Sequence, residues 1–146
     1  MKYLLIEINN EKWWIELNSD NYATRQIIFD EFEKVHISCF EDCLAEGLIN
    51  EKDLDGIITK ISKEKFEHIW NSVLSNHMKE WDAIKTKYPI GKCVEGICKY
   101  FYPQGAIIVV PDCIVLYIGC NTIKLNQSIN SRIIAYDEQN MWLITN

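Results

Sequence analysis

The sequence predicts an α+β fold: an N-terminal antiparallel sheet with one long amphipathic helix, followed by a small five-stranded β-barrel. Three observations carry this prediction. Short runs rich in β-branched residues recur in both halves of the chain, which favours strands. One apolar stripe at helical spacing occupies residues 63–85. Glycines interrupt the apolar runs of the C-terminal part, as tightly bent barrel strands require.

Four strand-like runs open the chain. Residues 4–8 and 13–17 are joined by Asn9-Asn10-Glu11-Lys12, whose asparagines tolerate the left-handed conformation of a tight hairpin turn. Residues 22–29 and 32–38 are typical of a second antiparallel pair. We therefore expect a four-stranded meander, wrapped by an acidic loop over residues 40–56 that holds one helical turn.

The strongest local signal is the helix expected over residues 63–85. Ser62 is a suitable N-cap, and Glu64 favours the positive end of the helix dipole. The stripe that follows is made of Phe66, Ile69, Trp70, Val73, Leu74, Trp81 and Ile84. At 1.5 Å per residue the helix is about 35 Å long, enough to pack on the sheet and continue toward the barrel. Core packing is the expected role of Trp81, and a partner-binding role is the alternative.

Five further strands are expected after residue 88. Val94, Gly96 and Cys98 share one face of the first strand, and Gly96 removes a side chain where the strand must curl. Tyr102-Pro103-Gln104-Gly105 is a turn signal between this strand and the next. The polar segment 126–130 is expected to be a loop, and the remaining strands are expected at 106–110, 114–118, 132–136 and 141–144.

The C-terminal part resembles the S1 branch of the OB-fold. The resemblance rests on Gly91-Lys92-Cys93-Val94-Glu95-Gly96-Ile97-Cys98, on Gly105-Ala106-Ile107-Ile108-Val109, and on Ile133-Ile134-Ala135-Tyr136-Asp137-Glu138 running into Trp142-Leu143-Ile144. It implies an S1-like barrel domain over residues 87–146. An α+β domain ending in the long helix is then expected over residues 1–86.

The S1 resemblance also implies single-stranded RNA binding, which in OB-folds uses aromatic stacking inside a positively charged groove. The aromatic residues typical of the family around the first hairpin glycine are replaced here, because Gln104 precedes Gly105 and Ile107 lies two residues after it. The residues that remain for an RNA-binding role are Lys99, Tyr102, Tyr117 and Arg132.

Charge favours a protein partner over RNA. The chain has 15 Lys and Arg against 21 Asp and Glu, a formal net charge of -6. Residues 1–87 hold 11 basic and 17 acidic side chains, whereas residues 88–146 hold four of each. Phosphate binding needs a basic surface, so the acidic N-terminal part suits a basic protein partner instead.

Composition predicts a soluble protein of the cytoplasm. No apolar run reaches the roughly 18 residues that suggest a membrane span. The N-terminus meets Glu7 after four apolar residues and lacks a small-residue cleavage site, unlike a signal peptide. The six cysteines are then expected to be small buried hydrophobes rather than disulfide partners.

No catalytic residue, cofactor or metal site is predicted. His36, Cys39 and Cys43 could begin a zinc site or supply a thiol nucleophile, but no further ligand or orienting acid accompanies them. The carboxylates of residues 41–55 lack the spacing of a calcium loop. We therefore expect a protein that is not an enzyme.

The N-terminal part carries a second resemblance. It rests on Trp14-Ile15-Glu16-Leu17-Asn18-Ser19-Asp20-Asn21-Tyr22-Ala23-Thr24-Arg25 and on Ile61-Ser62-Lys63-Glu64-Lys65-Phe66-Glu67-His68-Ile69-Trp70. These segments resemble a small bacterial domain of unassigned function, related to the immunity proteins of toxin-immunity systems. The resemblance implies a non-enzymatic, immunity-like or regulatory module that binds another protein. The expected contacts are Trp13, as an aromatic anchor, and Glu41, Asp42, Glu46, Glu51, Asp53 and Asp55.

Overall fold

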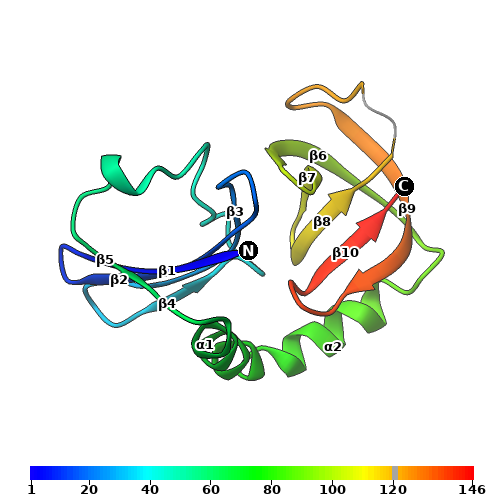
Figure 1. The fold of residues 1–146 in the computed structure, drawn as a ribbon. Helices are drawn as coiled ribbons and strands as arrows, with labels where there is room; N and C mark the ends of the chain where they lie inside the picture. Colours follow the sequence, from blue (N-terminus) through cyan, green and yellow to red (C-terminus); the bar gives the residue numbers. More distant parts are fainter. Residues whose placement is uncertain (120–121) are drawn as a thin grey trace. The chain divides into compact units, whose positions relative to one another are not determined.

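The computed structural model describes residues 1–119 and 122–146 and divides into two compact units. The sheet unit, Met1–Asn76, holds a five-stranded antiparallel sheet, and the barrel unit, His77–Asn146, holds a closed five-stranded barrel (Figure 1). Each unit contains one α-helix. The predicted α+β class is confirmed. The division falls between the two helices, whereas the sequence placed a domain boundary after residue 86.

The sheet of the first unit is a meander extended by one strand. Its order is β4-β3-β2-β1-β5, and its strands are β1 (Lys2–Ile8), β2 (Glu11–Leu17), β3 (Ala23–Phe29), β4 (Val35–Ile37) and β5 (Ile57–Lys60). Asn9 and Asn10 take positive φ angles of 51° and 64°, as the predicted hairpin turn requires. The meander was predicted and β5 was not.

The two faces of this sheet have different covers (Figure 1). Helix α1 (Lys63–Ser75) packs on the face that carries Tyr3, with the rings of Tyr3 and Phe66 at 5.2 Å. The opposite face, which includes Leu4 and Ile15, lies under residues 38–56, here called the acidic loop. The loop contains one short 3-10 helix, η1 (Glu51–Asp53), so the predicted wrapping loop with one helical turn is confirmed.

The prediction of a single helix over residues 63–85 is wrong, because the structure has two helices in this part of the chain. Helix α1 ends at Asn76, whose N–H bonds to Leu74 O and Val73 O, and α2 (Met78–Lys87) begins after His77. Ser75, Asn76 and His77 are weak helix formers and interrupt the apolar stripe. The buried residues also serve separate cores, since those of α1 belong to the sheet unit and those of α2 to the barrel unit.

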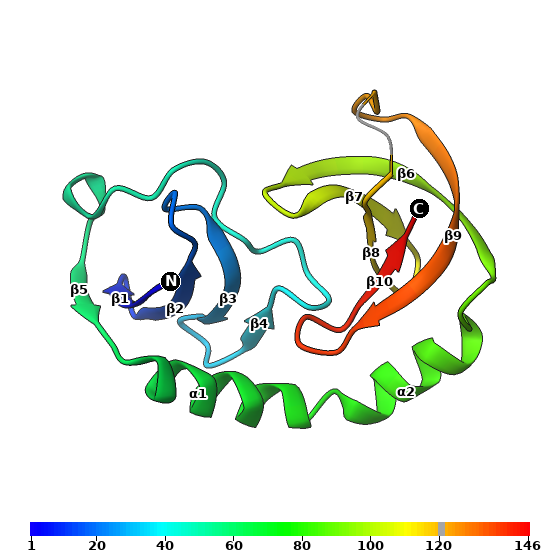
Figure 2. The ribbon, with the colours of Figure 1, turned by 45° about the vertical axis from the view of Figure 1, so that its right-hand side comes forward.

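The barrel closes in the order β10-β8-β7-β6-β9 (Figure 2). Its strands are β6 (Cys93–Tyr102), β7 (Gly105–Val110), β8 (Cys113–Tyr117), β9 (Ser128–Asp137) and β10 (Trp142–Thr145). Strands β10 and β8 run parallel and the other pairs are antiparallel. This mixed five-stranded barrel is compatible with an OB-like fold. Strand β9 begins at Ser128, inside the segment expected to be a loop.

Helix α2 is attached to the barrel by its aromatic and polar residues. Trp81 is fully buried and meets the ring of Tyr136 edge-on at 5.9 Å. The Tyr136 hydroxyl donates to Tyr88 O at 2.9 Å. Core packing of Trp81 is therefore confirmed. Neither helix in the described part of the chain is long and apolar enough to cross a membrane.

Candidate functional site

The acidic loop is attached to the sheet by buried side chains and hydrogen bonds. Its own Leu44 and Ile49 are buried, and the side-chain amide oxygen of the buried Gln26 accepts a bond from Ala45 N at 2.8 Å. Ile49 N donates to Asn21 O at 2.9 Å. These anchors hold the intervening residues in place, so the charged side chains of the loop project from a defined framework.

Five of the six predicted acidic contacts lie exposed on this framework: Glu41, Asp42, Glu46, Asp53 and Asp55. Asp53 accepts a bond from the Asn50 amide at 2.7 Å. The loop holds six carboxylates and one lysine. The whole sheet unit carries 8 Lys and Arg against 15 Asp and Glu, a net charge of -7, whereas the barrel unit has 7 against 6. The negative charge of the chain is therefore concentrated in this unit.

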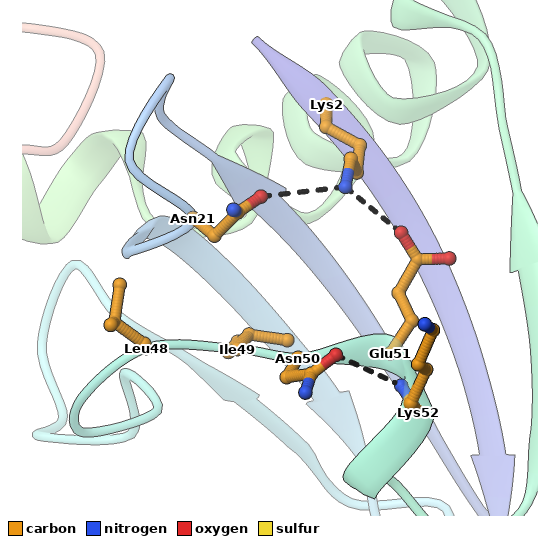
Figure 3. A pocket seen from close by; sticks show the side chains of 7 residues that line it. All are labelled: Lys2, Asn21, Leu48, Ile49, Asn50, Glu51 and Lys52. Carbon is orange, nitrogen blue, oxygen red and sulfur yellow. Dashed lines mark hydrogen bonds and ion pairs between the residues drawn. The ribbon is translucent and has the colours of Figure 1, made fainter.

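Glu51 has a structural partner. Its Oε1 accepts from Lys2 Nζ at 2.9 Å, and this bond lowers the pKa of the Glu51 carboxyl. The two side chains close one side of a cavity of about 410 Å³ that is also lined by Asn21, Leu48, Ile49, Asn50 and Lys52 (Figure 3). Because two lysines and one glutamate surround it, the cavity does not suit a cationic side chain. Leu48, 64% exposed, offers an apolar contact at its edge.

Trp13 lies half-buried on β2, and its indole N–H donates to Glu11 Oε2 at 2.8 Å. It stands opposite Ile6 of β1 and Ile28 of β3, on the sheet face that the acidic loop covers. The end of that loop reaches the same hairpin, since Gly56 packs against Glu7 O and Ile8. Trp13 on β2 and the end of the acidic loop, where Asp55 precedes Gly56, therefore both adjoin the β1–β2 hairpin.

His36 connects the acidic loop to the β3–β4 turn. Its Nδ1 lies 2.6 Å from Glu41 Oε2, and its Nε2 lies 3.0 Å from Asp30 Oδ2. Asp30 in turn accepts bonds from Phe32 N and Lys34 N, both at 2.9 Å. The bonds to Asp30 and Glu41 raise the pKa of His36. Sequence reasoning treated this histidine as a weak zinc or nucleophile candidate and missed its two carboxylate partners.

The thiols near His36 are poor metal ligands or nucleophiles. Cys39 is buried, and burial raises the pKa of Cys43 to about 12. Within residues 1–119 and 122–146 no group of three or more His, Cys, Asp and Glu side chains could hold a metal ion. No cysteine of those residues is in a disulfide, and Cys120 lies outside them.

The four residues named for RNA binding do not form one surface. Tyr102 is half-buried and packs on Trp142 and on Tyr100, with ring centroids at 6.0 and 6.2 Å. Lys99 is exposed and bonds Asn126 Oδ1 at 3.2 Å. Tyr117 lies two strands from Tyr102, near the same end of the barrel, because β7 pairs Gly105 with Tyr102 and Ala106 with Tyr117.

Arg132 is on β9, where it pairs with Cys93 at the start of β6. Its guanidinium donates to Gly91 O at 3.3 Å. Lys99 comes six residues after Cys93, which is at most about 20 Å at the usual rise. Arg132 and Lys99 therefore lie toward opposite ends of β6.

A buried ion-pair cluster was not predicted. Arg25 of β3 bonds Glu16 of β2 and Glu67 of α1, and its guanidinium lies over the rings of Phe66 and Trp70 at 4.9 and 5.1 Å. Burial acts to raise the pKa of Glu16, but the bonds from Arg25 and Thr24 lower it overall. The signal in the sequence was an Arg and a Glu at cross-strand spacing around the 18–22 turn.

Comparison of the chain with protein-family models and with curated proteins finds no match. The site is therefore interpreted from its geometry and charge.

Proposed function

We propose that this chain is a non-enzymatic, cytoplasmic protein-binding module, of an immunity-like or regulatory kind, that binds a basic protein through the acidic loop. The observation that carries the proposal is the net charge of -7 on the sheet unit, with five exposed carboxylates on one anchored loop. Such a surface steers a basic partner and repels an acidic one, which affects association rate and specificity most strongly.

The experiment is a matched pair of charge-neutralising variants. D42N/E46Q/D55N removes three exposed carboxylates from the acidic loop, and E80Q/D82N/E95Q removes three from the barrel unit. Both change the net charge by the same amount, so a purely global charge effect would be equal in the two.

We expect the native chain to purify with a basic protein at fixed stoichiometry, as judged by native mass spectrometry. The loop triple should weaken that complex about ten-fold or more and reduce its salt dependence, and the barrel triple should not. Equal weakening by both triples, or the absence of any stoichiometric protein from the native cell, contradicts the proposal.

Single-stranded RNA binding by the barrel is the second candidate. The stacked rings of Tyr100 and Tyr102, nearly parallel at 15°, support it because stacked aromatic side chains can hold bases. Filter binding at low salt should then show a clear salt slope and a loss of affinity in Y102S. Binding that is absent, or unchanged in Y102S, rules this candidate out.

A further inference from the structure

His36 has a carboxylate against each of its two ring nitrogens. Glu41 Oε2 lies 2.6 Å from Nδ1 and Asp30 Oδ2 lies 3.0 Å from Nε2. Ionised carboxylates only accept hydrogen bonds, so both ring nitrogens must donate. Only the imidazolium form has two N–H groups. With both carboxylates ionised, the arrangement therefore suits a protonated ring.

We propose that His36 is a proton-controlled latch that holds Glu41 against the β3–β4 turn when charged and releases it to the acidic surface when neutral. The neutral ring keeps one N–H and presents a lone pair at the other nitrogen. A carboxylate oxygen facing that lone pair at hydrogen-bond distance is repelled, so one of the two contacts must open.

Glu41 is the contact that opens. Asp30 is fixed by its two bonds from backbone N–H groups, and its side chain is 19% exposed. The side chain of Glu41 is 47% exposed and its carboxylate has no bond besides the one to His36 among those of the described residues. Moving Glu41 away costs one contact, whereas moving the Asp30 carboxylate would also disturb its two bonds within the turn.

Asp30 and Glu41 are the titratable groups that face the ring from the two segments packed against it. Asp30 comes from the β3–β4 turn and Glu41 from the acidic loop. Across the strand pair, His36 stands opposite Ile28, which carries no charge. The bonds to Asp30 and Glu41 also raise the pKa of His36, which brings its titration toward neutral pH.

The consequence for binding rests on the proposed function. The Asp30–His36–Glu41 group has a net charge of -1 when the ring is charged and -2 when it is neutral, and the exposed carboxylate of Glu41 is then no longer paired with a cation. Affinity for a basic surface should therefore rise as pH rises through the titration of His36.

The first measurement follows the latch in the full-length protein. The ¹⁵N signals of the His36 ring should show both nitrogens protonated at pH 5 and a midpoint above 6.5, and the Glu41 amide signal should move with the same midpoint. E41Q should lower the midpoint, and H36Q should abolish the titration of the residue-41 amide. H68Q, which removes an exposed histidine of the same unit, should leave both unchanged. A Glu41 amide that does not follow the ring, or a midpoint unchanged in E41Q, overturns the latch.

The second measurement couples the latch to binding, with a fluorescein-labelled peptide of ten lysines as the probe. At low salt we expect affinity about two- to five-fold tighter at pH 8.5 than at pH 6, since one exposed charge is gained. The change should disappear in H36Q, become smaller in E41Q, in which His36 still loses its charge but no carboxylate is released, and persist in H68Q. Equal affinity at both pH values in the native protein overturns the regulatory role. A latch that titrates as described in a protein that never binds the peptide overturns the proposed function and leaves the latch standing.

Discussion

Arg25 on β3 donates two hydrogen bonds to Glu16 on β2, from Nε to Oε1 at 2.9 Å and from Nη2 to Oε2 at 2.5 Å. The two residues stand opposite each other in the strand register, and the arginine side chain is 2% exposed. Glu67 of α1 bonds the same guanidinium from the helix side. One buried cation thus ties the sheet to its helix.

Removing this cation should be severely destabilising to the sheet unit. Arg25→Met leaves the Glu16 carboxylate buried without its partner, and breaking a buried pair in this way costs about 3–5 kcal/mol. The double variant R25M/E16M removes both charges and should recover most of the loss. Urea denaturation followed on NMR signals of the sheet unit measures both. Lys34→Met, at an exposed position, is the control, and a cost for R25M no larger than that of the control contradicts the prediction.

A side chain at residue 96 should destabilise the barrel. A Cβ on Gly96 would collide with Ile108 Cγ2 and lie 2.9 Å from Val109 O, and the carbonyl cannot move without disturbing the β6–β7 pairing. Gly96→Ala should therefore cost about 1–3 kcal/mol, as overpacking does. Thermal unfolding of the barrel unit tests this, with Gly91 as the comparison site: a Cβ there meets no atom within 4 Å, although its φ of 91° adds strain. If G96A lowered the free energy of unfolding less than G91A does, β6 would have space for a side chain at residue 96, contrary to the prediction.

The role of Gly96 was predictable because it depends on alternation along one strand. The same holds for the Asn9-Asn10 hairpin and the Ser62 cap, whose side chain accepts from Lys65 N at 3.2 Å. Strand β5 was missed because residues 57–60 follow an irregular loop, and only their pairing with β1 makes them a strand. The partners of His36 and Arg25 could not be identified from the sequence, because Glu41 and Glu67 come close to them only when the chain packs.

Acid should loosen α2 from the barrel through Glu138. This carboxylate accepts hydrogen bonds from Trp81 Nε1 at 2.6 Å and from Lys85 Nζ at 3.1 Å. Both bonds lower the pKa of Glu138, and the bond from the indole has the larger effect. A carboxyl whose pKa is lower in the folded state than in the unfolded state stabilises the fold at pH values above its ordinary pKa of 4.5. This stabilisation is lost as the pH falls through the pKa of the folded state. The protection factors of the α2 amides against hydrogen exchange, which correct for the intrinsic effect of pH on the exchange rate, should thus fall below pH 4.5.

The variant Glu138→Ala should remove this acid dependence and cost about 1 kcal/mol at pH 7, a value reduced from that of a buried charged bond because the side chain is 58% exposed. Glu80→Gln, on the exposed part of α2, is the matched control. Unchanged α2 exchange in E138A would mean that Trp81 is held by packing alone.

Removing a hydroxyl inside the barrel should stabilise it. Ser131 of β9 is 4% exposed and stands opposite Val94 of β6, and its Oγ has no hydrogen-bond partner among the residues that the structure describes. A buried hydroxyl without a partner costs free energy that a methyl group does not. Ser131→Ala should therefore raise the free energy of unfolding by about 1 kcal/mol and the barrel's melting temperature with it. Ser128→Ala is the control, because the Ser128 hydroxyl bonds Glu95 at 3.1 Å on the exposed side of the same strand. A loss of stability in S131A would show that the hydroxyl finds an acceptor in solution.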